Sequence, residues 1–155
     1  MLISSLLSLG SIIIAPKVTD KADVISTLLD LNTEWDATTR RMVNEAVFER
    51  ESIMSTGVGN GIAIPHAKVS DLQSSAIFIG LLDHPVDFQS FDGIPVDLVV
   101  LVVGSTTKNS DHLKILSRLS RLLMNQSLVN DIRSSVTKQS IYDIITIGEA
   151  HVFVT

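Results

Sequence analysis

The chain has 155 residues, of which 45% are hydrophobic, 5% are aromatic and 19% are charged. This length corresponds to a single domain over residues 1–155. The composition argues against a disordered chain and favours a core of Leu, Ile and Val. With a formal net charge of −5, the chain as a whole lacks the excess positive charge that is typical of nucleic-acid-binding proteins. The absence of cysteine excludes disulfides, thiolate nucleophiles and cysteine-ligated metal sites.

The charge is unevenly distributed along the chain. Residues 105–138 contain six Lys or Arg and two Asp or Glu, whereas the remainder contains six basic and fifteen acidic residues. Two interpretations stay open. The basic residues form a solvated helix face that is balanced elsewhere, or they form a patch that faces an anion such as phosphate.

Membrane insertion is not expected from this sequence. No uninterrupted apolar stretch reaches about 18 residues, the length that a spanning helix requires. The apolar segment 1–16 lacks the charged n-region of a signal peptide, and Pro16 follows Ala15, the only small candidate for a cleavage site. We therefore expect this segment to belong to the folded protein, and the protein to be cytoplasmic.

The first elements in the chain are a short helix and a strand. Leu2, Leu6 and Leu9 have helical spacing before Gly10, so the first ten residues are expected to form a helix. The β-branched run of residues 12–14 suits a short buried strand.

Two longer helices are expected next, the first ending near Leu31 and the second near Ser52. The predicted N-terminal caps are Thr19 or Asp20 for the first helix and Asp36 or Thr38 for the second. The expected apolar faces consist of Val24, Leu28 and Leu31, and of Met42, Val43, Ala46 and Val47.

The middle of the chain combines strands with turns. A glycine-rich loop over 55–61 precedes the short strand 62–64, which ends at Pro65 and His66. The further expected elements are a strand at 75–82, a turn at 83–85, an edge strand at 86–88 that closes at 92–93, and the strongest strand at 96–103.

The last part of the chain is predicted to be helical. A helix over 111–124, capped by Asn109 or Ser110, is followed by helices near 127–134 and 140–146. The face of the first is assigned to Leu113, Leu116, Ser117, Ser120 and Leu123, and residues 151–155 are expected as a strand or a loose tail. Because several strands are nearly continuous apolar runs, we expect an α/β fold: a single-domain mixed β-sheet sandwiched by α-helices.

His66 is the histidine best placed for chemistry. Pro65 fixes the backbone just before it, and the glycines of the preceding loop allow backbone N–H groups to approach an anion. A neutral imidazole can act as a nucleophile if its other nitrogen is held by a second His, a carboxylate or a backbone carbonyl. The alternative is that the loop is merely a hairpin or a bulge. It is not a Walker A motif, because no Gly-Lys-Ser/Thr follows.

His112 and Arg50 are further candidates for binding an anion. His112 lies in the first turn of the helix that follows the strongest strand, where a ligand at the end of the sheet would meet the helix N-terminus. Arg50 has the bidentate guanidinium that suits phosphate. The alternative for His112 is a surface position beside the helix cap, and for Arg50 it is a solvated cation at a helix end.

Four segments together resemble a known family: 49–52 (Glu-Arg-Glu-Ser), 55–57 (Ser-Thr-Gly), 61–68 (Gly-Ile-Ala-Ile-Pro-His-Ala-Lys) and 111–116 (Asp-His-Leu-Lys-Ile-Leu). They resemble the enzyme IIA domains of the bacterial phosphotransferase system, of the fructose/mannitol type (type 2), which includes the nitrogen-regulatory branch. The opening helix, the strand at 12–14 and the paired helices also fit the layout of that family, so the resemblance covers nearly the whole chain.

The resemblance implies a phosphohistidine carrier. His66 would accept a phosphoryl group on Nε2 from an HPr-like phosphocarrier, His112 would pack near that group, and Arg50 would help to neutralise it. Ser55, Thr56, Gly57 and Gly61 would lie where hydroxyl or backbone donors can help, and no metal or organic cofactor is implied. Transfer between two imidazoles depends mainly on positioning and charge stabilisation, which such residues can supply.

The resemblance also implies partners. Phosphate would pass to a IIB partner, or the phosphorylation state itself would be a nitrogen or metabolic signal. Because the sequence shows neither a membrane domain nor a cysteine for a IIB-type phosphocysteine, a IIB partner would be a separate chain, and the regulatory branch is favoured. A docking face around His66 is expected to be partly apolar and exposed, with Val58, Ile62 and Val69 contributing unless they belong to the core.

Two other functions are considered. The chain could be a regulatory module that works by docking to other proteins without transferring phosphate. It could also be a metal-dependent hydrolase, although no HExxH or similar ligand spacing supports this. The residues that such a hydrolase would use are His66, His84, His112, Asp83 and Asp111.

Overall fold

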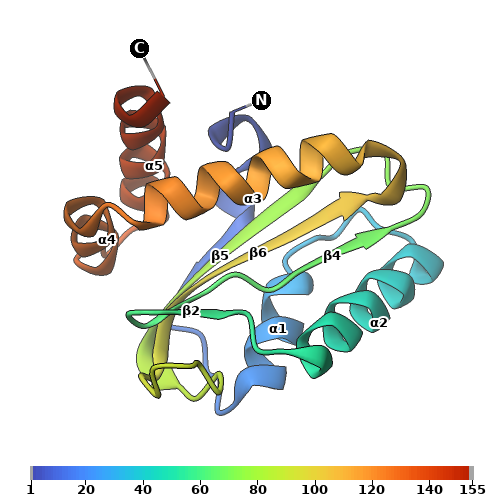
Figure 1. Ribbon diagram of the computed structural model, residues 1–155, viewed down its shortest axis with the longest axis horizontal. Helices are drawn as coiled ribbons and strands as arrows, with labels where there is room; N and C mark the ends of the chain where they lie inside the picture. The colour runs from blue at the N-terminus through green and yellow to red at the C-terminus, as the bar shows by residue number, and fades with distance from the viewer. Residues whose placement is uncertain (1, 154–155) are drawn as a thin grey trace.

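The computed structural model describes residues 2–153, which contain a six-stranded mixed sheet with helices on both faces (Figure 1). Five strands follow the order β1-β5-β6-β3-β2, and β4 also pairs with β6. The strand bounds are Ile12–Ile14 (β1), Gly57–Gly59 (β2), Ile62–Ala63 (β3), His66–Val69 (β4), Ala76–Val86 (β5) and Val96–Ser105 (β6).

The antiparallel pair of β5 and β6 forms the centre of the sheet. Both strands are nearly continuous apolar runs, as is typical of strands covered on both faces. Because side chains alternate along a strand, Leu98 and Val100 pack into one core, whereas Val99 and Leu101 pack into the core on the opposite face.

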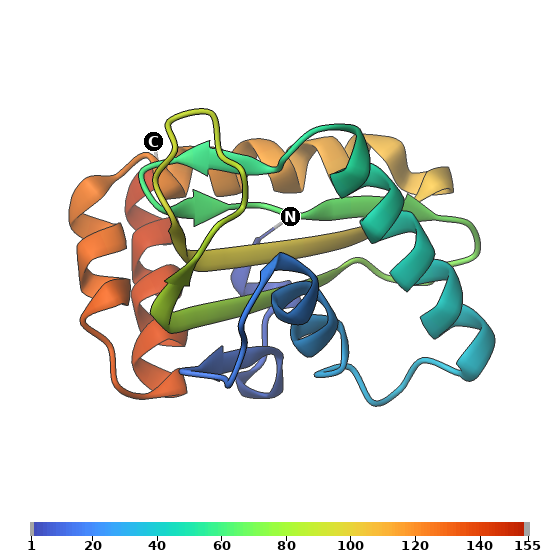
Figure 2. The same cartoon turned by 90° about the horizontal axis from the view of Figure 1, so that it is seen from below.

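Helices cover each face of this sheet. One face carries α1 (Lys21–Leu29) and α2 (Ala37–Ile53). The other carries α3 (Asn109–Leu123), α4 (Gln126–Arg133) and α5 (Lys138–Phe153) together with two N-terminal 3-10 turns, Ser4–Leu6 and Leu9–Ser11. In Figure 2, α4 and α5 lie at one end of the sheet and α2 lies at the other. The predicted α/β sandwich is confirmed. No helix within residues 2–153 combines the length and the apolar character needed to cross a bilayer.

Local signals correctly located the first two long helices. The Asp20 side chain accepts a hydrogen bond from Asp23 N–H, and the Asp36 side chain accepts one from Thr39 N–H, so each acts as the N-terminal cap. Val24 and Leu28 of α1 are buried as predicted, and so are Val43 and Val47 of α2. The helix α1 ends at Leu29, two residues before the expected end.

His66 begins a strand that the sequence did not indicate. β3 and β4 both run parallel to β6, with Ile62 opposite Leu98 and His66 opposite Val102. Pro65 has no N–H group to donate, but its carbonyl accepts from Val102 N–H at 2.9 Å, which keeps the chain aligned with β6. His66 therefore lies near the carboxyl end of β6, where the connection to α3 starts.

The prediction of a helix in the first ten residues was wrong. The segment forms two 3-10 turns, and Ile3 and Leu7 are the buried residues, whereas Leu2 and Leu9 are exposed. The cause is a distant contact, because the Glu149 side chain accepts hydrogen bonds from the N–H groups of Ile3 and Ser4. These bonds hold the backbone in a path that helical spacing cannot indicate.

The predicted turn at 83–85 and edge strand at 86–88 were also wrong. β5 continues through Pro85 to Val86, which pairs with Val96. The register between β5 and β6 shifts between Leu81 and Val86, and a proline is tolerated at such an irregularity because no ladder hydrogen bond is needed from it. The chain turns only in the segment 87–95 that follows.

The buried face of α3 differs from the prediction. His112, Ile115, Leu119 and Leu122 are buried, whereas Leu113 is exposed. Ile115, Leu119 and Leu122 have the regular i, i+4, i+7 spacing of large apolar residues, whereas the predicted face included two serines.

The two final helices exist as predicted, but α5 is longer than expected. It continues to Phe153, so the expected final strand is wrong for residues 151–153, and residues 154–155 lie outside the described part.

Candidate functional site

His66 is held in a defined orientation at the start of β4. Its Nδ1 atom lies 2.8 Å from the carbonyl oxygen of Ile64, two residues earlier. A carbonyl oxygen can only accept, so Nδ1 carries the hydrogen in this contact and the lone pair of the neutral ring lies on Nε2. The sequence left three groups open as the one that holds this nitrogen: a second His, a carboxylate or a backbone carbonyl. In the structure it is the backbone carbonyl.

A cavity of about 260 Å³ borders His66. The rest of its wall comes from the last turn of α2, the segment that follows it, the hairpin strand β2, the residue after β3 and the helix α3. The other lining residues are Arg50, Ser55, Thr56, Gly57, Val58, Ile64, Leu116 and Ser120. The structure thus gathers five of the predicted site residues at one cavity, namely His66, Arg50, Ser55, Thr56 and Gly57.

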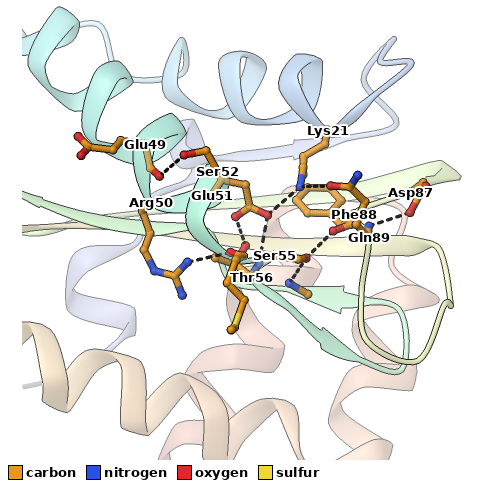
Figure 3. Close-up of polar contacts among 12 residues, drawn as sticks. Lys21, Glu49, Arg50, Glu51, Ser52, Ser55, Thr56, Asp87, Phe88 and Gln89 are labelled. Atoms are coloured by element: carbon orange, nitrogen blue, oxygen red, sulfur yellow. Dashed lines mark hydrogen bonds and ion pairs between the residues drawn. The ribbon is translucent and has the colours of Figure 1, made fainter.

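Arg50 occupies the last turn of α2, where a cation is favoured by the helix dipole. Its Nη1 donates to the carbonyl of Met54 at 2.8 Å, which folds the side chain back toward the segment after the helix (Figure 3). A guanidinium has five N–H donors, so one internal bond leaves others available at the cavity wall.

His112 is a buried partner of the site, not the surface residue of the alternative interpretation. It is 3% exposed, and its ring centroid lies 6.0 Å from that of His66. Burial lowers the pKa of His112 to about 4, with smaller contributions from the charge that His66 carries when protonated and from Lys68, so the His112 ring is neutral at pH 7. Gly104 makes room for it, because a Cβ there would lie 2.5 Å from Nδ1 of His112.

The hydroxyl groups of the loop are engaged with the protein itself. Ser55 Oγ donates to the carbonyl of Phe88 and accepts from Gly57 N–H at 3.1 Å. Thr56 Oγ1 donates to the carboxylate of Glu51 at 2.6 Å, and Thr56 N–H donates to the same carboxylate at 3.1 Å. In this structure these side chains shape the loop and do not point free donors at an anion (Figure 3).

Glu51 supports the loop beside His66, and in the sequence it was singled out only as part of the segment 49–52. It is buried, and besides Thr56 its partner is the ammonium group of Lys21 from α1, at 3.2 Å. Lys21 also donates to the side chain of Gln89 at 3.1 Å. One signal was present in the sequence: a carboxylate in the last turn of a helix opposes the helix dipole, so it requires a specific partner.

Gly61 lies outside the lining of the cavity. The glycine-rich loop is a hairpin of β2 and β3 with an irregular register, which is the shape proposed in the alternative interpretation. Gly61 has φ +78° in its turn, and a Cβ there would lie 2.8 Å from Nη2 of Arg133. Arg133 in turn donates to the carbonyl of Asn60 and pairs with Asp97. Gly61 therefore shapes the tip of the hairpin.

The expected apolar docking face is only partly present. Val58 is 49% exposed and lines the cavity, and Met54 is exposed beside Arg50. Ile62 and Val69 are buried in the two cores, because they belong to strands paired with β6. Of the three residues suggested for docking, Val58 alone is at the surface.

The residues suggested for a hydrolase are not arranged around a metal ion. Within residues 2–153 no group of three or more His, Asp or Glu side chains is placed to hold one. His84 is exposed on β5, where its nearest carboxylate is that of the adjacent Asp83 at 3.9 Å.

Known proteins resemble this chain along most of its length. The family model described as "Phosphoenolpyruvate-dependent sugar phosphotransferase system, EIIA 2" matches residues 5–147. The chain is 37% identical over 150 residues to a nitrogen regulatory protein of Bradyrhizobium diazoefficiens, which covers 97% of this chain and 98% of that protein.

Two solved structures share the fold. The crystal structure of the nitrogen regulatory protein IIA-Ntr from Neisseria meningitidis matches with a TM-score of 0.86 at 25% identity, over 92% of this chain and 98% of that one. The mannitol enzyme IIA of Escherichia coli, solved in complex with phosphorylated enzyme IIB, matches with a TM-score of 0.73 at 16% identity, over 90% and 96% of the two chains.

Proposed function

We propose that this chain, which belongs to the EIIA type 2 family of the phosphoenolpyruvate-dependent sugar phosphotransferase system, carries a phosphoryl group on Nε2 of His66. The observation that carries the proposal is the hydrogen bond from Nδ1 of His66 to the carbonyl of Ile64. When the ring is neutral, this bond leaves Nε2 as the unprotonated, nucleophilic nitrogen.

In the proposed transfer, Nε2 of His66 attacks the phosphorus of a phosphohistidine on an HPr-like carrier. A new N–P bond forms while the N–P bond of the donor breaks, and the electron pair of that bond returns to the donor imidazole. The Nδ1–H group keeps its bond to Ile64, which stabilises the positive charge that develops on the ring. The step consumes neither water nor a proton, so positioning and charge stabilisation are the tasks of the protein.

Arg50 and His112 have different electrostatic roles beside the proposed phosphoryl group. Arg50 lines the cavity beside His66 and is placed to neutralise the phosphoryl oxygens. His112 lies close to His66 and is neutral at pH 7, so it adds no second full charge to hold the phosphate. A carrier has to release its phosphate easily, and a site with one cation and one neutral ring suits that requirement.

The proposed partners are proteins. The donor is an HPr-like phosphocarrier, and exposed Met54 and Val58 beside the cavity supply apolar contact area for it. The acceptor is a separate IIB protein or, in the regulatory role that the nitrogen regulatory relatives support, a target that responds to the phosphorylation state. The mannitol IIA of similar fold was solved with phosphorylated IIB, which supports the first option.

The decisive experiment is phosphoryl transfer from phosphoenolpyruvate through enzyme I and an HPr-type carrier, with intact mass as the readout. Wild type should gain one acid-labile phosphate, and His66→Ala should gain none because the accepting nitrogen is absent. His84→Ala is the matched control, since it removes an exposed imidazole from another strand. Phosphate on His66→Ala, or none on a folded wild type offered several carriers, would contradict the proposal.

A further inference from the structure

A second cavity, of about 490 Å³, lies on the flank of α3 that faces the end of α5. Its lining consists of Leu113, Lys114, Ser117, Arg118, Arg121 and Phe153. None of these residues lines the cavity at His66, to which α3 contributes Leu116 and Ser120 from its other flank. The two cavities are therefore separate, although they share one helix.

The wall of this second cavity carries concentrated positive charge. Lys114, Arg118 and Arg121 follow one another at i, i+4 and i+7 along α3, so their side chains lie on one flank of the helix. The ion pairs found within residues 2–153 all involve other side chains, so none of the three cations has a described carboxylate within 4.0 Å. Like charges at these spacings repel each other, and an anion between them would relieve that repulsion.

Phe153 organises the two guanidinium groups. The Cζ atoms of Arg118 and Arg121 lie 4.3 Å and 4.8 Å from the centroid of its ring. A guanidinium held over an aromatic ring is restrained by cation–π attraction, but its N–H groups remain available at the edge. Both forks are thereby restrained at the same ring before any ligand binds, which lowers the entropic cost of binding.

Arg118 also has a donor for which residues 2–153 supply no acceptor. Its Nη1 atom is buried from solvent and makes no hydrogen bond within the described part of the chain. A fully solvated helix face would leave this donor bonded to water, so that interpretation of the basic segment does not account for it. Buried donors are nearly always paired in native proteins, so an unpaired one on a residue that lines a cationic cavity points to an acceptor that a ligand supplies.

We propose that this cavity binds a small multivalent anion whose charges are carried by phosphate or carboxylate groups. Both groups accept the bidentate hydrogen bonds of arginine, and two anionic groups match the two guanidinium forks. Leu113 and Phe153 add apolar wall for the body of such a ligand. Binding at this cavity does not depend on phosphoryl transfer at His66.

The test is isothermal titration of the full chain, at low salt, with pyrophosphate in one arm and citrate in the other. At least one probe should bind saturably at a single site, and the stronger of the two shows which anionic group the site prefers. Arg118→Gln and Arg121→Gln should each weaken binding about tenfold, because each removes a charge-assisted bidentate contact. Arg41→Gln is the matched control, since it removes one exposed positive charge from α2 and should change affinity less than about twofold.

Two further variants distinguish a defined anion site at this cavity from diffuse attraction to positive charge and from binding at His66. Arg118→Lys keeps the charge but loses the fork, so it should bind more weakly than wild type even if Arg118→Gln proves unstable. His66→Ala should bind the probe like wild type, because the two cavities share no lining residue. Absence of saturable binding, equal losses in Arg118→Gln and Arg41→Gln, or loss of binding in His66→Ala would each overturn the proposal.

Discussion

Glu51 and Glu149 are both buried carboxylates, with exposed fractions of 6% and 2%, but they hold different parts of the molecule. Glu51, near the end of α2, accepts from the backbone and hydroxyl of Thr56 and pairs with Lys21. Glu149 of α5 accepts from two backbone N–H groups of the N-terminal segment and from the hydroxyl of Ser4. Each carboxylate satisfies donors of an irregular segment that has few partners of its own.

The two carboxylates differ in whether the segment that each one holds lines the cavity at His66. Thr56, which Glu51 holds, lines the cavity at His66, whereas neither Glu149 nor the N-terminal segment lines it. The same chemistry is thus expected to support function in one place and stability alone in the other. Variants at the two carboxylates, together with the buried neutral His112, test that separation.

The largest effect is expected at Glu149. Glu149→Ala leaves two backbone donors and one hydroxyl without their acceptor, so the free energy of unfolding should fall by about 4 kcal/mol. Urea denaturation measures this, and the rate of phosphorylation of the folded variant should equal that of wild type. Glu45→Ala, at an exposed position of α2, is the control and should change stability by less than about 0.5 kcal/mol. A slowed phosphorylation in Glu149→Ala would remove the distinction between the two carboxylates.

His112 should make stability depend on pH. Its pKa lies at about 4 in the folded protein against 6.5 in the unfolded chain, so below pH 6.5 the unfolded state binds a proton that the folded state does not. The free energy of unfolding is therefore highest above pH 6.5, and it decreases by about 3 kcal/mol as the pH falls to 4. The measurement is the difference in unfolding free energy between wild type and His112→Gln at a series of pH values. A difference that does not change over this range would contradict the prediction.

A smaller effect, on rate, is expected at Glu51. In Glu51→Gln an amide NH₂ group replaces one of the oxygens that face Thr56 and Lys21, so the loop beside His66 loses part of its support. We expect phosphorylation about tenfold slower, which corresponds to about 1.4 kcal/mol in the barrier. Glu49→Gln, an exposed neighbour in α2, should keep the wild-type rate. Equal rates in the two variants would mean that Glu51 is only structural.

The smallest effect is expected at Lys21. Its side chain is 21% exposed, so water partly screens the pair with Glu51. Lys21→Met should lower the free energy of unfolding by about 1 kcal/mol and leave the two Thr56 bonds to Glu51 in place. Urea denaturation and the phosphorylation assay together check this, and a rate loss greater than that of Glu51→Gln would reverse the proposed order of importance.

The regular elements were predictable because their signals are local. The caps at Asp20 and Asp36 and the strand at 96–103 depend on residues within a few positions of one another. The N-terminal turns and the passage of β5 through Pro85 were not predictable in this way. The first depends on Glu149, which is 146 residues away from Ile3 in the sequence, and the second on the pairing of Val86 with Val96.

The candidate site also combines features that local sequence predicts with features that depend on tertiary contacts. The sequence by itself determined that His66 follows Pro65 and a glycine-rich segment, and its motif was sufficient to identify the family. Only the tertiary structure decided that Nδ1 of His66 is bonded to Ile64, that His112 is buried and neutral, and that Thr56 is held by Glu51.

The basic residues of α3 show the same distinction between local sequence and tertiary contacts. Its composition was visible in the sequence, but the two interpretations of it could not be separated there. Phe153, which organises Arg118 and Arg121, belongs to the last helix, and only the packing of that helix against α3 brings the ring to them. Periodicity, caps and motifs are encoded in neighbouring residues, whereas tautomer, burial and charge compensation are properties of contacts between elements, which spacing along the chain does not report.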